Sequence, residues 1–176
     1  MFKFLVTFVT LVTFVTLVSI NAASFGQGRY LIRAERVFDG RQLQSWTEVL
    51  VVNGRIEAVG TDLDDSGSEV IDLPGATIMP GMIDAHTHLL LHPYDETSWN
   101  DQVLKESRAE RVARATVHAR RTLEAGFTAI RDLGSEGAGY DDVGIKVSIE
   151  KGVIVGPRVL VAGPAIVATG SYGPKG

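Results

Sequence analysis

The sequence predicts an α/β protein in which a small β part precedes a parallel sheet of strand–helix–strand units. Between residues 30 and 80, short β-rich segments are separated by turn signals. From residue 82 onward, apolar strand segments alternate with helical ones, which is typical of parallel sheets. The chain has 176 residues, of which 45% are hydrophobic, and this is enough for a sizeable core.

The β part is defined by its turns. "YLIRAERVFDG" (30–40) predicts a strand that ends in an Asp-Gly turn. "EVLVVNGRIEAVG" (48–60) predicts a hairpin around Asn53-Gly54, because both residues tolerate the positive φ of a type I′ turn. Pro-Gly pairs divide residues 70–81 into two short strands. We expect this part to consist of short antiparallel pieces.

The second part begins with "MIDAHTHLLL", a nearly continuous apolar run that predicts a strand buried on both faces. Residues 101–125 predict one helix, with Val112 and Val117 on its apolar side and Gly126 as its stop. Further along, we expect a strand at 127–134, a helix at 140–152 and a strand at 157–166.

The first 23 residues match a secretory signal peptide. One lysine precedes an apolar stretch from Phe4 to Val18, and small residues follow at Ala22 and Ala23. The stretch is shorter than the ~20 apolar residues of a membrane-spanning helix, and threonines interrupt it. We therefore expect export to the periplasm or secretion, with no stable membrane association after cleavage. An uncleaved membrane anchor and a mis-assigned start codon are the alternatives.

Composition narrows the function classes. The net charge of −4 is mild, and the arginines of residues 108–121 alternate with glutamates and apolar residues, as on a solvated outer helix. We therefore expect no nucleic-acid partner. The absence of cysteine excludes disulfides, thiolate metal ligands and a cysteine nucleophile.

The strongest chemical signal is the pair His86 and His88. Side chains two apart in a strand share a face, so both imidazoles project together at the C-terminal end of the strand, with Thr87 opposite. Such a pair can chelate a divalent metal ion. Asp84 lies earlier on the same face and could orient a histidine or reach the metal. Two structural histidines are the alternative, because His-x-His alone is a weak signal.

Other candidate residues have weaker support. Asp132 ends the second strand and could support the site or contact substrate; an ion pair with Arg131 or a loop cap is the alternative. Tyr172, in the glycine-rich "ATGSYGPKG", could hydrogen-bond a substrate. His92 is expected to be a loop residue. His118, in mid-helix, is expected to be a packing or solvated residue.

"IMPGMIDAHTHL" resembles the first barrel strand of the amidohydrolase superfamily. "LEAGFTAIRDLGS" and "KGVIVGPRVLVAGPAI" resemble its imidazolonepropionase-like and prolidase-like branch. The resemblance begins at Tyr30 and implies a small β-sandwich fused to a (β/α)₈ TIM barrel. Residues 30–80 would be part of the sandwich, and residues 81–176 would supply barrel strands one to three. Because a barrel takes about 250 residues, we expect an N-terminal fragment.

The resemblance also implies a site and an activity. It makes His86 and His88 metal ligands, and it places a lysine, two histidines and a proton-transferring aspartate on later strands that this sequence lacks. The implied cofactor is a divalent metal, with zinc expected, as one or two ions. The implied reaction is hydrolysis of a C–N bond in a small molecule such as a dipeptide, N-acyl amino acid or cyclic amide.

Two departures from the family pattern matter. Without the later ligands, we expect the 176 residues alone to be inactive, and a non-catalytic relic or binding domain is the alternative. Many relatives carry a histidine in a "TGGHG"-like stretch where this chain has "TGSYG" around Tyr172. The family's substrate assignments therefore do not transfer to this position.

Overall fold

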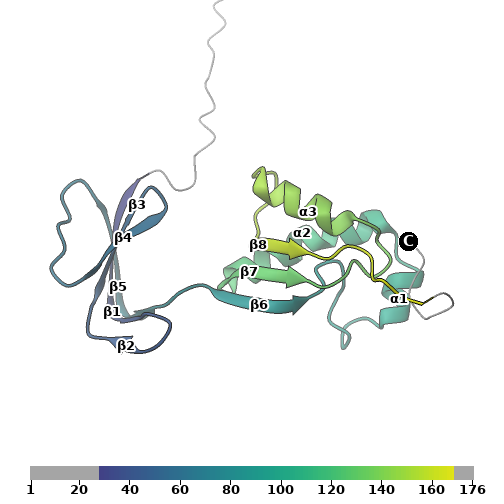
Figure 1. Cartoon of the computed structure of the whole chain (residues 1–176), viewed down its shortest axis with the longest axis horizontal. Coiled ribbons are helices and arrows are strands. Elements are labelled where there is room, and N and C mark those ends of the chain that lie inside the picture. The colour runs from purple at the N-terminus through teal and green to yellow at the C-terminus, as the bar shows by residue number, and fades with distance from the viewer. Residues whose placement is uncertain (1–27, 169–176) are drawn as a thin grey trace, which may run out of the picture. The chain divides into compact units, whose positions relative to one another are not determined.

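The computed structural model describes residues 28–168, and the chain divides into two compact units, Met1–Ile78 and Met79–Gly176 (Figure 1). The predicted signal peptide and Tyr172 lie outside the described residues. Within residues 28–168, no helix is long and apolar enough to cross a membrane.

The first unit is one five-stranded sheet. Its strands run in the order β2-β1-β3-β4, and β5 also pairs with β1. Leu31 and Val37 of β1 and Val49 and Leu50 of β3 are buried. The bounds are β1 Arg29–Phe38, β2 Leu43–Gln44, β3 Glu48–Val52, β4 Arg55–Gly60 and β5 Glu69–Ile78.

The predicted hairpin is confirmed. Val52 pairs with Arg55, and the two residues between them, Asn53 and Gly54, have φ of 50° and 74°. Both values are positive, as a type I′ turn requires.

The expectation of purely antiparallel pairing in this unit is wrong. β1 and β5 run parallel, from Tyr30 opposite Glu69 to Val37 opposite Ile78. The β3–β4 hairpin and the loop after it provide the long connection that a parallel pair needs. Residues 70–78 also form one strand instead of two. The pairing shifts register near Pro74 and Gly75, so the strand passes this proline through an irregularity.

The second unit contains the predicted parallel βα arrangement. Three parallel strands lie in the order β6-β7-β8, and α2 and α3 contact β7 and β8 respectively (Figure 1). The bounds are β6 Met82–Thr87, α1 Trp99–Leu104, α2 Arg108–Glu124, β7 Phe127–Asp132, α3 Asp141–Glu150 and β8 Arg158–Val161. The core consists of Leu89, Leu90, Ala115, Ala119, Ile130, Ala138, Ile145 and Val159.

The prediction of one helix at 101–125 is wrong, because the helix is interrupted: α1 ends at Leu104 and α2 begins at Arg108. Ser107 caps α2, and its hydroxyl accepts a hydrogen bond from the Glu110 N–H. The predicted stop is confirmed: Gly126 has φ of 95° and follows the helix. The predicted apolar side is only partly right, because Val112 packs against the core whereas Val117 is exposed.

The prediction of a buried strand in "MIDAHTHLLL" is also wrong. β6 ends at Thr87, and Ile83 within it is 73% exposed. The burial falls instead on Leu89, Leu90 and Leu91, which follow the strand. Ile83 pairs with Ala129, on the face opposite that of the core residue Ile130, so its side chain points away from the helices.

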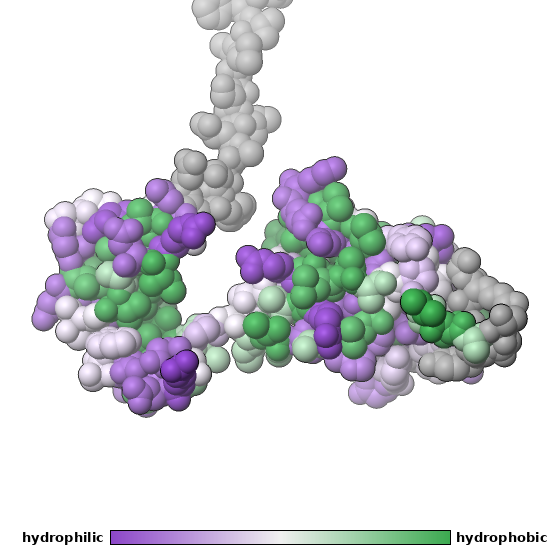
Figure 2. Space-filling model, viewed as in Figure 1, coloured by the Kyte–Doolittle hydropathy of each residue, from purple (hydrophilic) through white to green (hydrophobic). Residues whose placement is uncertain are grey.

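One face of this sheet is open. In β8, Val159 belongs to the core while its neighbour Leu160 is 58% exposed. Alternate residues of a strand point to opposite faces, so Leu160 projects away from the helices. Figure 2 shows apolar side chains at the surface of this unit. Parallel sheets are normally covered on both faces, and among residues 28–168 the helices cover only one face of this sheet.

Candidate metal centre

The two candidate ligands lie together at the C-terminal end of β6. His86 is the second-last residue of β6, and His88 is the first residue after the strand. Their ring centres are 5.5 Å apart, with the ring planes at 69°. Two imidazoles that share a tetrahedral zinc ion at about 2.0 Å per Zn–N bond have ring centres roughly 5 Å apart. The spacing is therefore compatible with one shared ion.

The His88 ring is held by the next strand's loop. Its Nδ1 lies 3.0 Å from the carbonyl oxygen of Gly134, in the β7–α3 loop (residues 133–140). A carbonyl only accepts, so this bond places the ring proton on Nδ1 and leaves the Nε2 lone pair available. Metal-binding histidines in proteins are commonly oriented in this way.

Glu136 adds a carboxylate beside the same ring. Its Oε1 is 3.8 Å from Nδ1 of His88, and its Oε2 accepts a hydrogen bond of 3.0 Å from the Trp99 indole N–H. Trp99 starts α1, so the side chain of Glu136 is fixed from a second element. The sequence does not single out Glu136, because no motif or spacing relates it to His88.

Asp84 contacts the backbone of His86, not its ring. Its Oδ1 accepts a 3.0 Å hydrogen bond from the His86 N–H. Within residues 28–168, no group of three or more His, Asp or Glu side chains is arranged to hold a metal ion. A catalytic zinc site takes about three protein ligands and one open position. The described residues thus offer two imidazoles toward such a site.

Asp132 is fully buried and joins two loops. One of its carboxylate oxygens accepts from the Leu89 N–H at 3.0 Å, and the other accepts from the Gly134 N–H at 3.1 Å. Burial raises the pKa of this carboxyl above its ordinary value. These hydrogen bonds are those of a loop cap, and a role of Asp132 in supporting the site or contacting substrate stays a prediction. The ion pair with Arg131 is not formed, because the Arg131 guanidinium donates to the carbonyl of Ala85.

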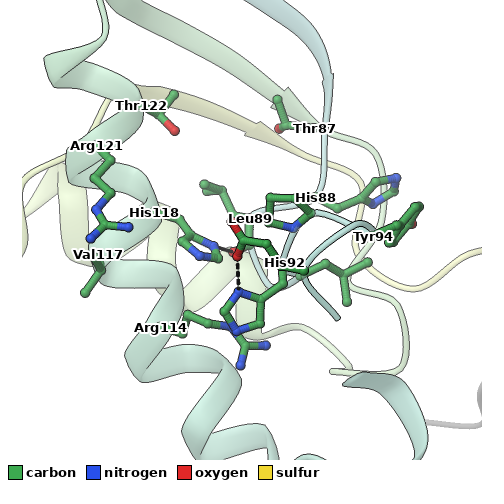
Figure 3. A pocket seen from close by; sticks show the side chains of 13 residues that line it. Thr87, His88, Leu89, His92, Tyr94, Arg114, Val117, His118, Arg121 and Thr122 are labelled. Carbon is green, nitrogen blue, oxygen red and sulfur yellow. Dashed lines mark hydrogen bonds and ion pairs between the residues drawn. The ribbon is translucent and has the colours of Figure 1, made fainter. Parts of the chain in front are cut away.

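A cavity of about 600 Å³ lies between α2 and the β6–α1 loop, residues 88–98 (Figure 3). His88, His92 and His118 line it together with Arg114 and Arg121. The Nδ1 atom of His118 is hydrogen-bonded to the Leu89 carbonyl oxygen at 3.1 Å. Burial lowers the pKa of this imidazole. His92 is a loop residue whose Nδ1 is 3.3 Å from a Glu96 carboxylate oxygen. Both histidines therefore occupy the kinds of position predicted for them.

A histidine pair at the C-terminal end of a strand in a parallel βα sheet is typical of the metal-dependent hydrolases built on βα barrels, whose active sites lie at that end of the strands. Comparison with known proteins makes this specific. Residues 77–173 match the sequence model of the amidohydrolase family, and the chain belongs to that family.

Individual relatives agree with this assignment. The chain is 39% identical to a dihydroorotase of Elusimicrobium minutum over 62 residues, 35% of this chain and 14% of that protein. It is 44% identical to an imidazolonepropionase of Klebsiella pneumoniae over 55 residues, 31% of this chain and 14% of that protein.

Solved structures share the fold over a longer stretch. A Xaa-Pro dipeptidase with bound methionine in its active site superposes with a TM-score of 0.68 and 28% identity, over 82% of this chain and 36% of that one. A putative prolidase from Bifidobacterium longum gives 0.62 and 28%, over 84% and 33%. The chain therefore spans about a third of the structures that it matches, which confirms the α/β fold class as an N-terminal barrel portion.

Proposed function

We propose that the protein hydrolyses a C–N bond of a small molecule with the help of a divalent metal ion, for which His86 and His88 supply two ligands. The observation that carries this proposal is that the ring centres of His86 and His88 lie 5.5 Å apart, close enough for both imidazoles to bind one ion. Membership of the amidohydrolase family supports the reaction class.

The residues have distinct roles in this proposal. His88 would bind the metal through Nε2, because its Nδ1 faces the Gly134 carbonyl. His86 would bind from β6, where Asp84 fixes its backbone N–H. When bound, a divalent metal activates water and polarises the scissile carbonyl. Imidazole donors suit zinc, which is the ion that we propose, as one or two ions.

The names of the matched relatives support a substrate class. Those matched are named as a dihydroorotase, an imidazolonepropionase and a Xaa-Pro dipeptidase. We therefore propose a dipeptide, an N-acyl amino acid or a cyclic amide as substrate.

We also propose that the 176 residues are inactive alone, and that further ligands belong to later barrel strands. Two observations support this: within residues 28–168 no three His, Asp or Glu side chains are arranged to hold a metal ion, and Leu160 is exposed on a sheet face that the described helices leave open. A barrel covers that face with its remaining strands.

The test combines metal binding with turnover. The dialysed chain is titrated with Zn²⁺, bound metal is measured by elemental analysis, and hydrolysis of a dipeptide and cyclic-amide panel is followed. We expect zinc binding that is lost when His86→Asn and His88→Asn are combined, and no turnover. Turnover by these residues would contradict the proposed inactivity. Zinc binding unchanged by the double substitution would overturn the ligand assignment.

For localisation, we propose export with removal of the first 22 or 23 residues. The charge and apolar pattern of residues 1–23 supports this. Intact-mass measurement of the mature protein tests it: a retained N-terminus would favour a membrane anchor or a cytoplasmic protein.

A further inference from the structure

Arg111 is the least expected side chain of the second unit. It lies in α2, where the sequence predicts solvated arginines, yet it is only 1% exposed. It shares its helix face with the buried Ala115 and Ala119, at spacings of four and eight residues. Burial lowers the pKa of its guanidinium, but arginine keeps its charge in proteins. A buried charge is costly unless its hydrogen bonds are satisfied.

The hydrogen bonds of Arg111 go to backbone carbonyls of two loops. Nε donates to Leu90 at 3.2 Å, in the β6–α1 loop. Nη1 donates to Glu136 and Nη2 to Ser135, each at 3.0 Å, in the β7–α3 loop. One planar group thus holds both loops in a fixed relation, because the guanidinium presents its donors in a rigid fork.

These carbonyls flank the contact that orients His88. Leu90 is two residues beyond His88. Ser135 directly follows Gly134, whose carbonyl oxygen accepts the hydrogen bond from Nδ1 of His88. The buried carboxylate of Asp132 fastens the same two loops by their N–H groups, at Leu89 and Gly134. Arg111 and Asp132 therefore bind complementary backbone groups of the same two loops: Arg111 binds carbonyls and Asp132 binds N–H groups.

We propose that Arg111 is a positioning residue for the metal centre: through the Leu90, Ser135 and Glu136 carbonyls it holds the Gly134 carbonyl against Nδ1 of His88, so that Nε2 is presented to the metal. The inference rests on the proposed function only in that His88 is a metal ligand. The state of the His88 ring can be measured without metal.

The first readout is the tautomer of His88 in the metal-free full chain, from long-range ¹H–¹⁵N NMR of the four histidines. Three variants are compared with the unsubstituted chain: Arg111→Met, Arg111→Lys and Arg120→Met. Arg120 lies on the same helix but is exposed, so its variant is the matched control. We expect the Nδ1–H tautomer in the unsubstituted chain and in Arg120→Met, and a mixture of tautomers in Arg111→Met. Arg111→Lys keeps the positive charge but lacks the planar guanidinium donors, so its fraction of the Nδ1–H tautomer should lie between those of the unsubstituted chain and Arg111→Met.

The second readout is the dissociation constant for Zn²⁺. Loss of a residue that orients a ligand typically weakens metal binding by about tenfold to a hundredfold. We expect at least a tenfold weakening for Arg111→Met and no change for Arg120→Met. If Arg111→Met does not fold, Arg111→Lys decides the matter by the same two readouts.

A folded Arg111 variant with the wild-type His88 tautomer would overturn the inference, whether or not zinc binds. A changed tautomer without zinc binding by any variant would support the role of Arg111 while contradicting the proposed function. The two failures are therefore distinguishable.

Discussion

The Nδ1 atom of His88 lies 3.0 Å from the carbonyl oxygen of Gly134, so the loop after β7 sets the orientation of a ring that follows β6. His86, by contrast, is exposed, and its backbone N–H donates a hydrogen bond to the Asp84 carboxylate. The ring of His88 is thus oriented by a hydrogen bond to another loop, whereas the hydrogen bond of His86 fixes its backbone and not its ring.

The first prediction concerns the two ligands separately. We expect His88→Asn and His86→Asn each to weaken Zn²⁺ binding by at least about tenfold, since each removes one of two imidazoles. Equilibrium dialysis with metal analysis measures this. His92→Asn is the control, because His92 lies in the adjacent cavity and faces Glu96; we expect less than a twofold change. Equal losses in all three variants would point to nonspecific histidine binding.

The second prediction concerns the first unit. Glu48 is buried, and its carboxylate accepts from the Leu63 N–H at 2.7 Å and from Arg33 at 2.9 Å. These bonds, the Leu63 N–H first, lower the pKa of Glu48 below its ordinary 4.5. A lowered carboxyl pKa contributes stability above the unfolded value, and that stability is lost as pH falls through the folded value.

Accordingly, Glu48→Gln should reduce the free energy of unfolding by about 1–3 kcal/mol at neutral pH. The difference from the unsubstituted chain should shrink as the pH falls below 4.5. Urea unfolding at a series of pH values measures this, with the exposed Glu57→Gln of β4 as control. A loss that stays constant down to about pH 3 would mean that packing, and not the carboxylate charge, is responsible.

Local signals in the sequence predicted local structure well. The turn at Asn53-Gly54 and the stop at Gly126 depend on backbone preferences of the residues themselves. The break before α2 also had a readable signal, because Ser107 and Glu110 form the Ser-x-x-Glu pattern of a capping box. The helical spacing of apolar residues continues through residues 105–107, and this continuity favoured a single helix over a break.

Non-local features were not predictable in the same way. The parallel pairing of β1 with β5 depends on contacts between segments that are distant in the chain. The proximity of His86 and His88 followed from the two-residue repeat of a strand, but the contact of His88 with Gly134 requires two loops to meet. Arg111 looked like any helix-surface arginine until the carbonyls around it were known.

The third prediction is a pH dependence that arises from His118. Burial lowers its pKa below the ordinary 6.5, while the bond to the Leu89 carbonyl opposes this. His92, Arg114 and Arg121 also disfavour its protonation. For a base with a lowered folded pKa, the unfolded chain binds more protons, so stability falls as pH drops through the unfolded value.

We therefore expect the free energy of unfolding of the second unit to decrease from about pH 7.5 to about pH 5.5, by at most ~1.4 kcal/mol per pH unit for one proton. His118→Gln should flatten this slope, whereas Arg120→Gln should leave it unchanged. Urea unfolding followed by fluorescence measures the slope. An identical slope in His118→Gln would assign the effect to other groups.

The fourth prediction tests how closely the start of β6 packs on β7. A Cβ added at Gly81 would lie 2.1 Å from Oγ1 and 2.7 Å from Cβ of Thr128. Rotation of the threonine cannot relieve the second contact, because Cβ is fixed to the backbone. The strands are held nearby by the bond from the Met82 N–H to the Gly126 carbonyl, so the clash cannot relax without moving the pairing.

Gly81→Ala should therefore destabilise the second unit by about 1–3 kcal/mol, as overpacking does in cores. Gly144→Ala is the matched control, because apart from its chain neighbours and the nearby helix backbone no atom lies within 4 Å of a Cβ there, and the residue is inside α3. That substitution should stabilise by about 0.5–1 kcal/mol, since alanine favours the helix. If Gly81→Ala were as stable as Gly144→Ala, the close packing of residue 81 against Thr128 would be wrong. The alignment of β6 that brings His86 and His88 to the end of the sheet would then need another cause.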